Sequence, residues 1–385
     1  MRQRRQGLAQ YRPGVSVKRI ARRAFLGTLP GAAALWGQAR PASSHLIWLG
    51  ALSKEFLLID EATEKVIDRV PLQTGVPRGV RLSYDKKKLY VFTPMRTGIE
   101  IIDLAARKVT SSFPLSEADR NVRTRGYAPD PQDRLLYTIF SVAVKKIDRF
   151  EIEKPKFGVI DLAEKKIVRA AELPKDEPRL GQGAELRVTP DGKHLYAFGE
   201  NVLIFDTSDF KLVEKIELSK PLYPGVATIG LGIRDEPMDD RNEVVGVFNS
   251  TDPIVRRRIF GIARFDLIKK TFDFTPLGPA AGGMGGLQVT PDGKTGYTVA
   301  FQGEHGNRRS EFWVFDMESR NVARRLEFDG PINFNFTLSS NGRLIYIHGS
   351  APFMEVYDAA TLERRRVIDF HADKTTRLLI LPRSA

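Results

Sequence analysis

Short, mostly apolar runs that each end in an aspartate recur along this 385-residue chain. An apolar run followed by an aspartate and small or polar residues is typical of a β-strand that enters a turn. The seven runs are FLLID ending at Asp60, IEIID at Asp103, FGVID at Asp161, VLIFD at Asp206, IARFD at Asp266, FWVFD at Asp316 and MEVYD at Asp358. Their separations of 43, 58, 45, 60, 50 and 42 residues indicate one repeated unit with insertions of different length.

A repeat of about this length matches one four-stranded blade of a β-propeller. The fourth copy shows the unit most clearly, with strands predicted over 185–188, 194–198, 202–206 and 211–218. The first two strands are joined by a Thr-Pro-Asp-Gly-Lys turn at 189–193, in which proline presets φ and glycine permits a positive φ. A tyrosine follows the corresponding turn in five copies, at Tyr90, Tyr137, Tyr196, Tyr297 and Tyr346.

The two ends of the repeated region are each incomplete, and their deficits match. Residues 46–72 supply a second, a third and an outer strand, whereas residues 376–382 (TRLLILP) supply a single apolar strand. Pairing of the two ends closes the ring and removes the exposed edges of an open array. We therefore predict an all-β, seven-bladed β-propeller over residues 43–382, closed by a C-terminal strand that completes the first blade.

The first 39 residues have a different character. Arg22 and Arg23 precede Phe25 and Leu26, a mildly apolar run reaches Trp36, and small residues follow at 37–39. This order is typical of a twin-arginine signal peptide with a cleavage site. We predict a signal over residues 1–39 and a periplasmic or otherwise exported product. The alternative is a basic tail on a cytoplasmic protein.

The positive charge of the chain lies largely in that first segment. The whole chain has 60 Lys and Arg against 47 Asp and Glu, a net charge of +13. Residues 1–39 contain eight Lys or Arg and no acid, so the remainder has 52 minus 47, or +5. A nucleic-acid-binding function therefore loses its main support. No stretch after the signal is long and apolar enough for a transmembrane helix.

The chain contains no cysteine. This excludes disulfides, haem attached through Cys-x-x-Cys-His, iron-sulfur clusters and cofactors built on a cysteine cross-link. The five histidines stand far apart, with no metal-ligand spacing, and no Gly-x-Ser-x-Gly motif occurs. We predict no metal and no cofactor in this chain. The catalytic residues, if there are any, are not identified by the sequence.

The seven repeated aspartates invite a calcium or acid-base interpretation. They recur in every blade at the same strand-to-turn junction, whereas catalysis needs a carboxylate only once or twice. An aspartate at such a junction accepts hydrogen bonds from backbone N–H groups two or three residues later. We therefore predict that they cap turns.

Function in a propeller is expected where the repeat is broken. Two insertions stand out, at 141–155 in the third blade and at 249–259 in the fifth, and both fall between the second and third strands. The loops that enter the innermost strands should reach the same face, and a glycine run at 282–286 predicts a loop that passes close to the axis. The predicted partner- or ligand-binding residues on this face are Arg78, Arg123, Arg125, Arg179 and Asn333.

An arginine cluster at one axial mouth suits an anionic ligand or an acidic partner surface. The alternative is that each arginine binds carbonyl or carboxylate groups of a neighbouring blade.

With the repeat laid out, the chain resembles the seven-bladed propellers named for a Tyr-Val-Thr-Asn (YVTN) repeat, in which the Thr-Pro-Asp-Gly-Lys turn and the following tyrosine are hallmarks. Within that family it is most similar to the β subunit of quinohaemoprotein amine dehydrogenase, and more distantly to the methylamine dehydrogenase heavy chain. The likeness is most specific at 150–162 (FEIEKPKFGVIDL) and at 357–363 (YDAATLE).

The resemblance implies a periplasmic scaffold that packs against a small quinone-bearing subunit and a haem subunit, with the quinone and haem held by those partners. The leading hypothesis is therefore an exported, non-catalytic interaction subunit of an amine dehydrogenase-type complex. Two alternatives stay open: a solitary enzyme, such as a lactonase-like hydrolase with an axial metal, and a surface module that binds glycans or peptides.

Overall fold

A computed structural model of the chain describes residues 44–94, 97–220, 229–233, 240–251, 254, 256–280, 283–284, 286–303, 307, 309–328, 334–349 and 351–383. The predicted signal over residues 1–39 lies outside these ranges. Among the described residues, no helix has the length and hydropathy needed to cross a membrane.

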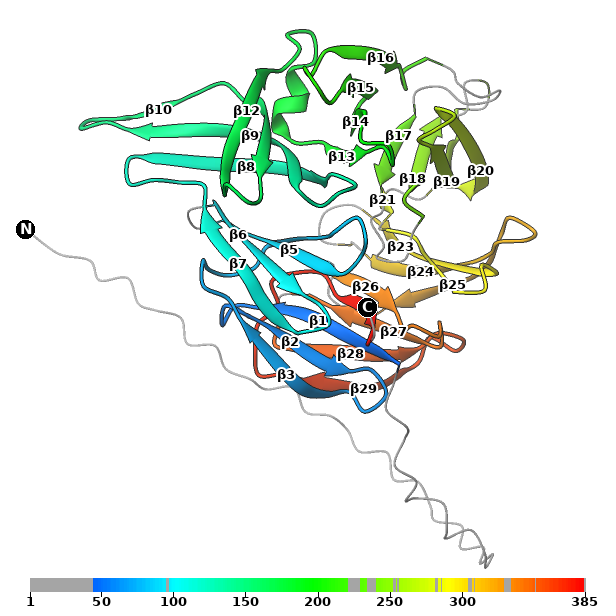
Figure 1. Cartoon of the computed structure of the whole chain (residues 1–385). Helices are drawn as coiled ribbons and strands as arrows, with labels where there is room; N and C mark the ends of the chain where they lie inside the picture. Colours follow the sequence, from blue (N-terminus) through cyan, green and yellow to red (C-terminus); the bar gives the residue numbers. More distant parts are fainter. Residues whose placement is uncertain are drawn as a thin grey trace, which may run out of the picture. The chain divides into compact units, whose positions relative to one another are not determined.

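The strands form seven antiparallel sheets, the blades of a β-propeller (Figure 1). The prediction of an all-β, seven-bladed fold is confirmed. Blade 1 contains β1 (His45–Ala51), β2 (Glu55–Asp60), β3 (Lys65–Pro71) and β30 (Leu379–Pro382); blade 2 contains β4 (Gly79–Leu82), β5 (Lys88–Thr93), β6 (Gly98–Asp103) and β7 (Lys108–Pro114); blade 3 contains β8 (Arg120–Pro129), β9 (Leu135–Lys145), β10 (Phe150–Ile152), β11 (Lys156–Asp161) and β12 (Lys166–Glu172).

The remaining blades repeat this order. Blade 4 contains β13 (Glu185–Val188), β14 (His194–Phe198), β15 (Val202–Asp206) and β16 (Leu212–Ile216); blade 5 contains β17 (Gly230–Ile233), β18 (Glu243–Thr251), β19 (Arg258–Asp266) and β20 (Thr271–Pro279); blade 6 contains β21 (Gly283–Met284), β22 (Gln288–Val289), β23 (Thr295–Gln302), β24 (Arg309–Asp316) and β25 (Asn321–Phe328); blade 7 contains β26 (Asn335–Leu338), β27 (Leu344–His348), β28 (Phe353–Asp358) and β29 (Arg364–Asp369).

The ring closes as the sequence predicts. Strand β30 pairs with β1 in antiparallel register, placing Leu381 opposite Leu46 and Leu379 opposite Trp48. Leu379 and Leu381 are buried in the core between blades 1 and 2, while the intervening Ile380 packs against the core between blades 7 and 1. The alternation of side chains along one strand thus contributes to two blade interfaces.

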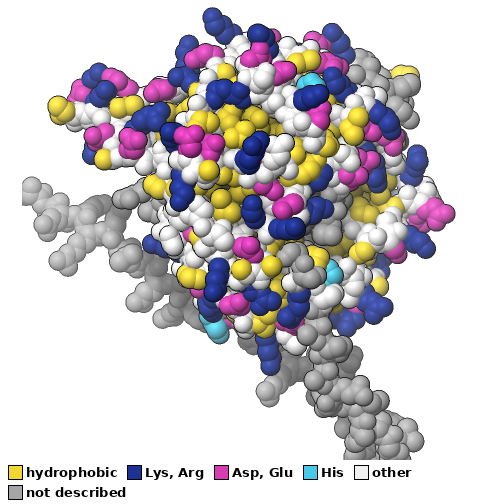
Figure 2. Space-filling model, in the orientation of Figure 1, with side chains coloured by type: hydrophobic (Ala, Val, Ile, Leu, Met, Phe, Trp, Pro, Cys, Tyr) yellow, Lys and Arg dark blue, Asp and Glu magenta, His cyan; other side chains and the backbone are white. Residues whose placement is uncertain are grey.

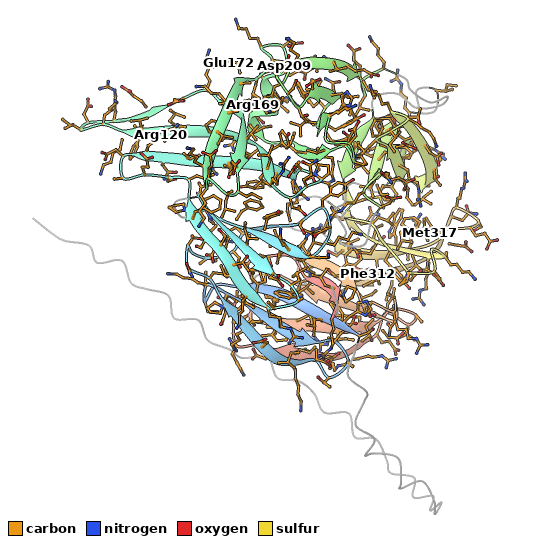
Figure 3. The ribbon with its side chains drawn as sticks, in the orientation of Figure 1. Arg120, Arg169, Glu172, Asp209, Phe312 and Met317 are labelled. Atoms are coloured by element: carbon orange, nitrogen blue, oxygen red, sulfur yellow. The ribbon has the colours of Figure 1, made fainter. Side chains whose placement is uncertain are left out.

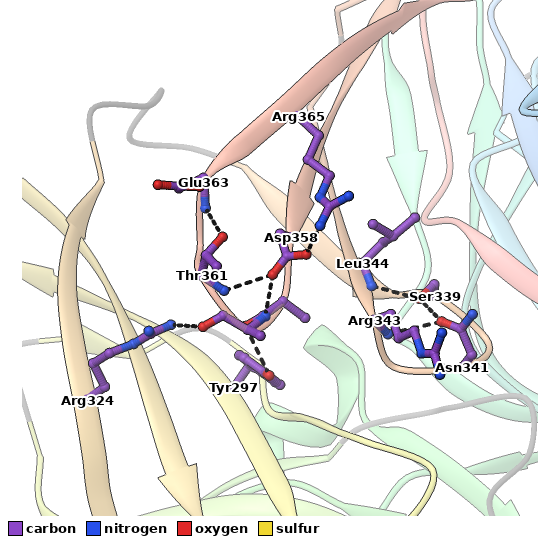
Figure 4. Close-up of polar contacts among 12 residues, drawn as sticks. Tyr297, Arg324, Ser339, Asn341, Arg343, Leu344, Asp358, Thr361, Glu363 and Arg365 are labelled. Atoms are coloured by element: carbon purple, nitrogen blue, oxygen red, sulfur yellow. Dashed lines mark hydrogen bonds and ion pairs between the residues drawn. The ribbon is translucent and has the colours of Figure 1, made fainter. Parts of the chain in front are cut away.

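All seven repeated aspartates cap turns, as predicted. Each accepts a hydrogen bond from a backbone N–H two or three residues later, at 2.7–2.9 Å, and the donors are Thr63, Ala106, Ala163, Ser208, Ile268, Glu318 and Ala360. Figure 4 shows this arrangement at Asp358, which also pairs with Arg365. These carboxylates therefore have a structural role, which is to stabilise the turn after each third strand.

Two of the tyrosines that follow the first turn connect one blade to the next. The Tyr196 hydroxyl donates to the Leu267 carbonyl of blade 5 at 2.9 Å, and the Tyr297 hydroxyl donates to the Ala359 carbonyl of blade 7 at 3.2 Å (Figure 4). Arg169 on β12, labelled in Figure 3, also contacts the next blade, with its guanidinium 4.9 Å from the centre of the Phe210 ring in blade 4. These contacts position turns of blades 4, 5 and 7 against the preceding blade.

We expect the variant Tyr196→Phe to lower the free energy of unfolding by about 1 kcal/mol, since it leaves the Leu267 carbonyl without its donor. Burial raises the pKa of Tyr196 to about 12, so the hydroxyl remains a donor at neutral pH. Tyr346→Phe is the matched control, because the buried Tyr346 hydroxyl has no hydrogen-bond partner within the described part of the chain. Urea titrations should show a lower midpoint for Tyr196→Phe and an unchanged one for Tyr346→Phe. Equal midpoints would contradict the assignment.

Both predicted insertions lie between second and third strands, at β9–β11 and β18–β19. In blade 3 the insertion forms β10, which pairs with the far end of β9, while β8 lengthens to pair with the other edge of β9. These extensions form a three-stranded arm, defined here as residues 120–124 of β8, 141–145 of β9 and 146–153. The arm projects from the ring in Figure 1.

Candidate functional site

The innermost strands surround an axial cavity of about 1030 Å³. Residues of every blade line it, and among them are the first residues of β4, β13 and β26. Because strands alternate in direction within a blade, the entry to an innermost strand lies at the same end as the connection between second and third strands. The cavity mouth and the arm therefore share one face of the propeller.

Arginine is the principal charged residue of the cavity. Arg78, Arg81 and Arg377 line it together with one acid, Glu185. Three positive charges against one negative charge give the described lining a formal charge of +2. A concave, partly desolvated site concentrates such a field and attracts anions.

Glu185 is held between two arginines. It pairs with Arg81, which comes from blade 2, and with Arg187 on its own strand. Arg81 also donates through Nε to the Tyr127 carbonyl of blade 3 at 3.2 Å. This network links three blades and fixes Arg81 in one orientation. The guanidinium of Arg81 is therefore a fixed positive charge in the cavity wall.

Another part of the cavity wall is aromatic and apolar. The rings of Phe92 and Tyr127 are stacked, with their planes 11° apart, and Phe198 of blade 4 also lines the cavity. Tyr127 reaches this position because β8 contains a bulge at Gly126, where φ is +67°. A Cβ at Gly126 would lie 2.5 Å from the Ala184 carbonyl oxygen, so glycine is required there.

The structure separates the five predicted site residues. Arg78 is exposed and lines the cavity, whereas Arg123 is exposed on the arm and Arg125 donates to the Gly181 carbonyl at 2.9 Å. Arg179 lies in the 3-10 helix η2 (Pro178–Gln182) and pairs with Glu200. Asn333 lies outside the described residues.

Two placements differ from the expectation. Arg123 and Arg125 lie within strand β8 and not in a loop that enters it, because β8 starts far out on the arm. Arg125 binds a carbonyl at the entry to the neighbouring blade 4, which is the alternative left open by the sequence, whereas Arg179 pairs with Glu200 of its own blade. Only Arg78 among the described four lines the cavity.

Sequence reasoning missed Arg81 and Arg377. Arg81 stands three positions after Arg78 in RGVRL, and Arg377 precedes the closing strand, so both lie near an innermost strand. The glycine run was a useful signal, because Met284 and Gly286 line the cavity as the predicted close approach to the axis requires.

No metal site is assembled in the part of the chain described here. No group of three or more His, Cys, Asp or Glu side chains comes together there in a way that could hold a metal ion. His348 is buried at the end of β27, and desolvation lowers its pKa to about 3, so it is neutral at physiological pH. The absence of a metal and of catalysis in this chain remains a prediction.

Comparison with known proteins bears on the fold. No family model and no curated protein matches the sequence. Dihydro-heme d1 dehydrogenase NirN is similar in structure, with a TM-score of 0.51 and 14% identity over 91% of this chain and 78% of that one. A functionally unknown protein from Desulfotomaculum acetoxidans has a TM-score of 0.53 and 11% identity over 88% and 99% of the two chains. At these identities the likeness shows that the chain is a β-propeller, and nothing narrower.

Proposed function

We propose that this chain is an exported, non-catalytic propeller that binds a protein partner through the blade 3 arm, as the β-like subunit of an amine dehydrogenase-type complex. The observation that carries the proposal is the arm itself. Export is inferred from the twin-arginine pattern at 22–26, and the type of complex from the YVTN-like repeat and the residues at 150–162.

The end of the arm exposes three large apolar side chains. The exposed fractions are 108% for Ile147, 66% for Phe150 and 77% for Ile152. Single exposed apolar residues are common on protein surfaces, but three within six residues of one ordered hairpin form a local cluster. Figure 2 shows apolar side chains at the end of this projection, among charged ones.

The hairpin holds these side chains in place. Phe150 is paired with Lys145 and Ile152 with Ala143, and the turn is closed by a hydrogen bond from the Lys146 amide to the Arg149 carbonyl at 2.8 Å. Since the backbone is ordered without a partner, binding would not incur the conformational entropy of folding this segment.

Several charged groups on and beside the hairpin of the arm are paired with one another. Arg149 binds Glu151 at 2.7 Å, Lys146 lies 3.6 Å from the same carboxylate, and Lys156 binds Glu153 at 3.3 Å. These exposed pairs contribute little stability. They do compensate the charges that lie beside the apolar cluster, so that burial against a partner depends chiefly on Ile147, Phe150 and Ile152.

The outer edge of β10 is also available for pairing. Among the described strands, β10 pairs only with β9, so its other edge has no neighbouring strand. Natural proteins protect such edges, commonly by covering them. A partner subunit that packs on the arm would cover the apolar side chains and this edge together.

The test is affinity purification of the tagged full chain from its native host, followed by mass spectrometry and an absorption spectrum. We expect a small quinone-bearing subunit and a haem subunit in stoichiometric amounts. Recovery of a colourless propeller alone would overturn the assignment to an amine dehydrogenase-type complex. Metal analysis and activity assays of that sample would then examine a solitary enzyme.

A variant of the arm tests the surface directly. We expect the triple variant Ile147→Ser, Phe150→Ser and Ile152→Ser to lose the partner while its melting temperature stays unchanged, because all three side chains are already in water. The matched control is Ile67→Ser together with Val168→Ser. Both are exposed apolar residues outside the arm, on the outer strands β3 and β12. Partner recovery that is equal for both variants would show that the arm is not the binding surface.

A further inference from the structure

We propose that the axial cavity is a binding site for a small organic carboxylate with an apolar or aromatic part. The inference rests on the lining of the cavity and is independent of the proposed protein partner on the arm. It assigns the chemical class of a ligand to the site.

The size of the cavity fits such a ligand. Small-molecule sites usually have volumes of about 300–1000 Å³, and this cavity measures about 1030 Å³. Glycine at the start of β4 leaves part of that room open. A Cβ built at Gly79 would make only ordinary contacts of 3.5 Å with Phe92, so a larger side chain there would extend into space that the native residue leaves empty.

The charge of the lining selects an anion. Glu185 is compensated twice, by Arg81 and by Arg187, so its carboxylate does not offset the charge of Arg78. Arg78 is exposed, and among the described residues no acidic group pairs with it. Its backbone is fixed by a hydrogen bond from its amide to the Phe92 carbonyl at 3.0 Å, which places the side chain at the mouth.

The shape of the arginine side chain and the aromatic rings beside it narrow the chemical class of the ligand further. A guanidinium binds a carboxylate through two parallel hydrogen bonds. The stacked pair Phe92 and Tyr127, with Phe198, offers an apolar surface in the same cavity. An inorganic anion would leave that surface in contact with water, whereas an organic carboxylate uses both parts of the wall.

The experiment is isothermal titration calorimetry on the full chain at low ionic strength, because salt screens exposed charges. The probes are phthalate, benzoate, succinate and inorganic phosphate, with benzylammonium as a cation of similar shape. We expect phthalate to bind at one site per chain with a Kd below about 1 mM, a weak but specific affinity, and more tightly than succinate or phosphate. Benzylammonium should give no heat of binding.

Variants locate the site. We expect Arg78→Gln to weaken phthalate binding at least about tenfold and Gly79→Leu to weaken it by covering part of the apolar surface beside Phe92. Arg123→Gln is the matched control, because this exposed arginine lies on the same face but outside the lining. The urea midpoint of each variant would show that the fold is retained.

Each other outcome overturns the proposal. Absence of phthalate and benzoate binding at about 10 mM, far above the Kd range of specific sites, would show that the cavity takes no aromatic carboxylate. Equal weakening by Arg123→Gln and Arg78→Gln would indicate diffuse attraction to the surface. Phosphate binding as tight as phthalate binding would indicate a simple anion site. None of these results depends on whether the arm binds a protein.

Discussion

A chain that ends at Thr375 is expected to lose the closed ring and to be recovered as an insoluble or loosely packed protein. The truncation removes β30, which supplies the innermost strand of blade 1. Without it, β1 has an open edge, and its buried residues Leu46 and Trp48 lose the strand that covers them. Exposed edges of this kind promote association between chains.

The size of this effect follows from the buried leucines. Leu379 and Leu381 are each 2% exposed, and replacing a buried leucine by alanine costs about 2–5 kcal/mol. Two such losses, added to the loss of the strand pairing, are comparable with the 5–15 kcal/mol that stabilises a typical domain. The double variant Leu379→Ala and Leu381→Ala should therefore be severely destabilised even though the chain length is unchanged.

A peptide with the sequence of residues 376–383 provides the decisive control. If the missing strand is the cause, adding this peptide to the chain that ends at Thr375 should restore the sharp urea transition. The same peptide with serine at positions 379 and 381 should not, because Leu379 and Leu381 are the side chains that the strand buries in the core between blades 1 and 2. A truncated chain that unfolds at the native urea midpoint without peptide would show that the ring does not depend on β30.

The closing strand could be predicted because its signal is local. An apolar run at the C-terminus and a missing innermost strand at the N-terminus point to the same pairing, and Leu381 lies opposite Leu46 as that pairing requires. The turn aspartates could be predicted for the same reason. Each acts on backbone N–H groups only two or three residues away, so the sequence contains both partners.

The lining of the axial cavity could be predicted only in part. Arg78, Arg81 and Arg377 come together through the closure of a ring, across nearly three hundred positions of sequence. Whether an arginine reaches the axis or a neighbouring carbonyl depends on details such as the bulge at Gly126, which sets the orientation of Arg125 and Tyr127. No repeat pattern specifies those details, since they occur where the repeat is irregular.

Glu100 is a buried acid that interrupts the apolar pattern of the repeat. It lies on β6 at the position that Leu57 and Leu203 occupy in their blades, and it is fully buried. Its carboxylate accepts hydrogen bonds from the Gln73 amide at 2.8 Å, from the Thr74 amide at 2.6 Å and from the Thr74 hydroxyl at 2.7 Å. The side chain thereby holds the segment that leads from blade 1 into β4.

We expect Glu100→Ala to lower the free energy of unfolding by about 3 kcal/mol, because the Gln73 amide, the Thr74 amide and the Thr74 hydroxyl all lose their acceptor. Glu100→Gln should cost less, since its amide oxygen keeps one acceptor at the same place. Urea titration of the two variants measures the difference. Equal losses would mean that the charge, and not the acceptor geometry, holds the segment.

Glu100→Ala should also affect ligand binding in the axial cavity, although Glu100 is not among the lining residues. The segment anchored by Glu100 at Gln73 and Thr74 continues directly to Arg78, so its release leaves that arginine held by β4 and by the hydrogen bond from its amide to the Phe92 carbonyl. We therefore expect Glu100→Ala, assayed well below its urea midpoint, to weaken phthalate binding severalfold, whereas Tyr196→Phe, a destabilising change in another blade, should not. Unchanged affinity in the Glu100→Ala variant would show that Arg78 is oriented by β4 alone.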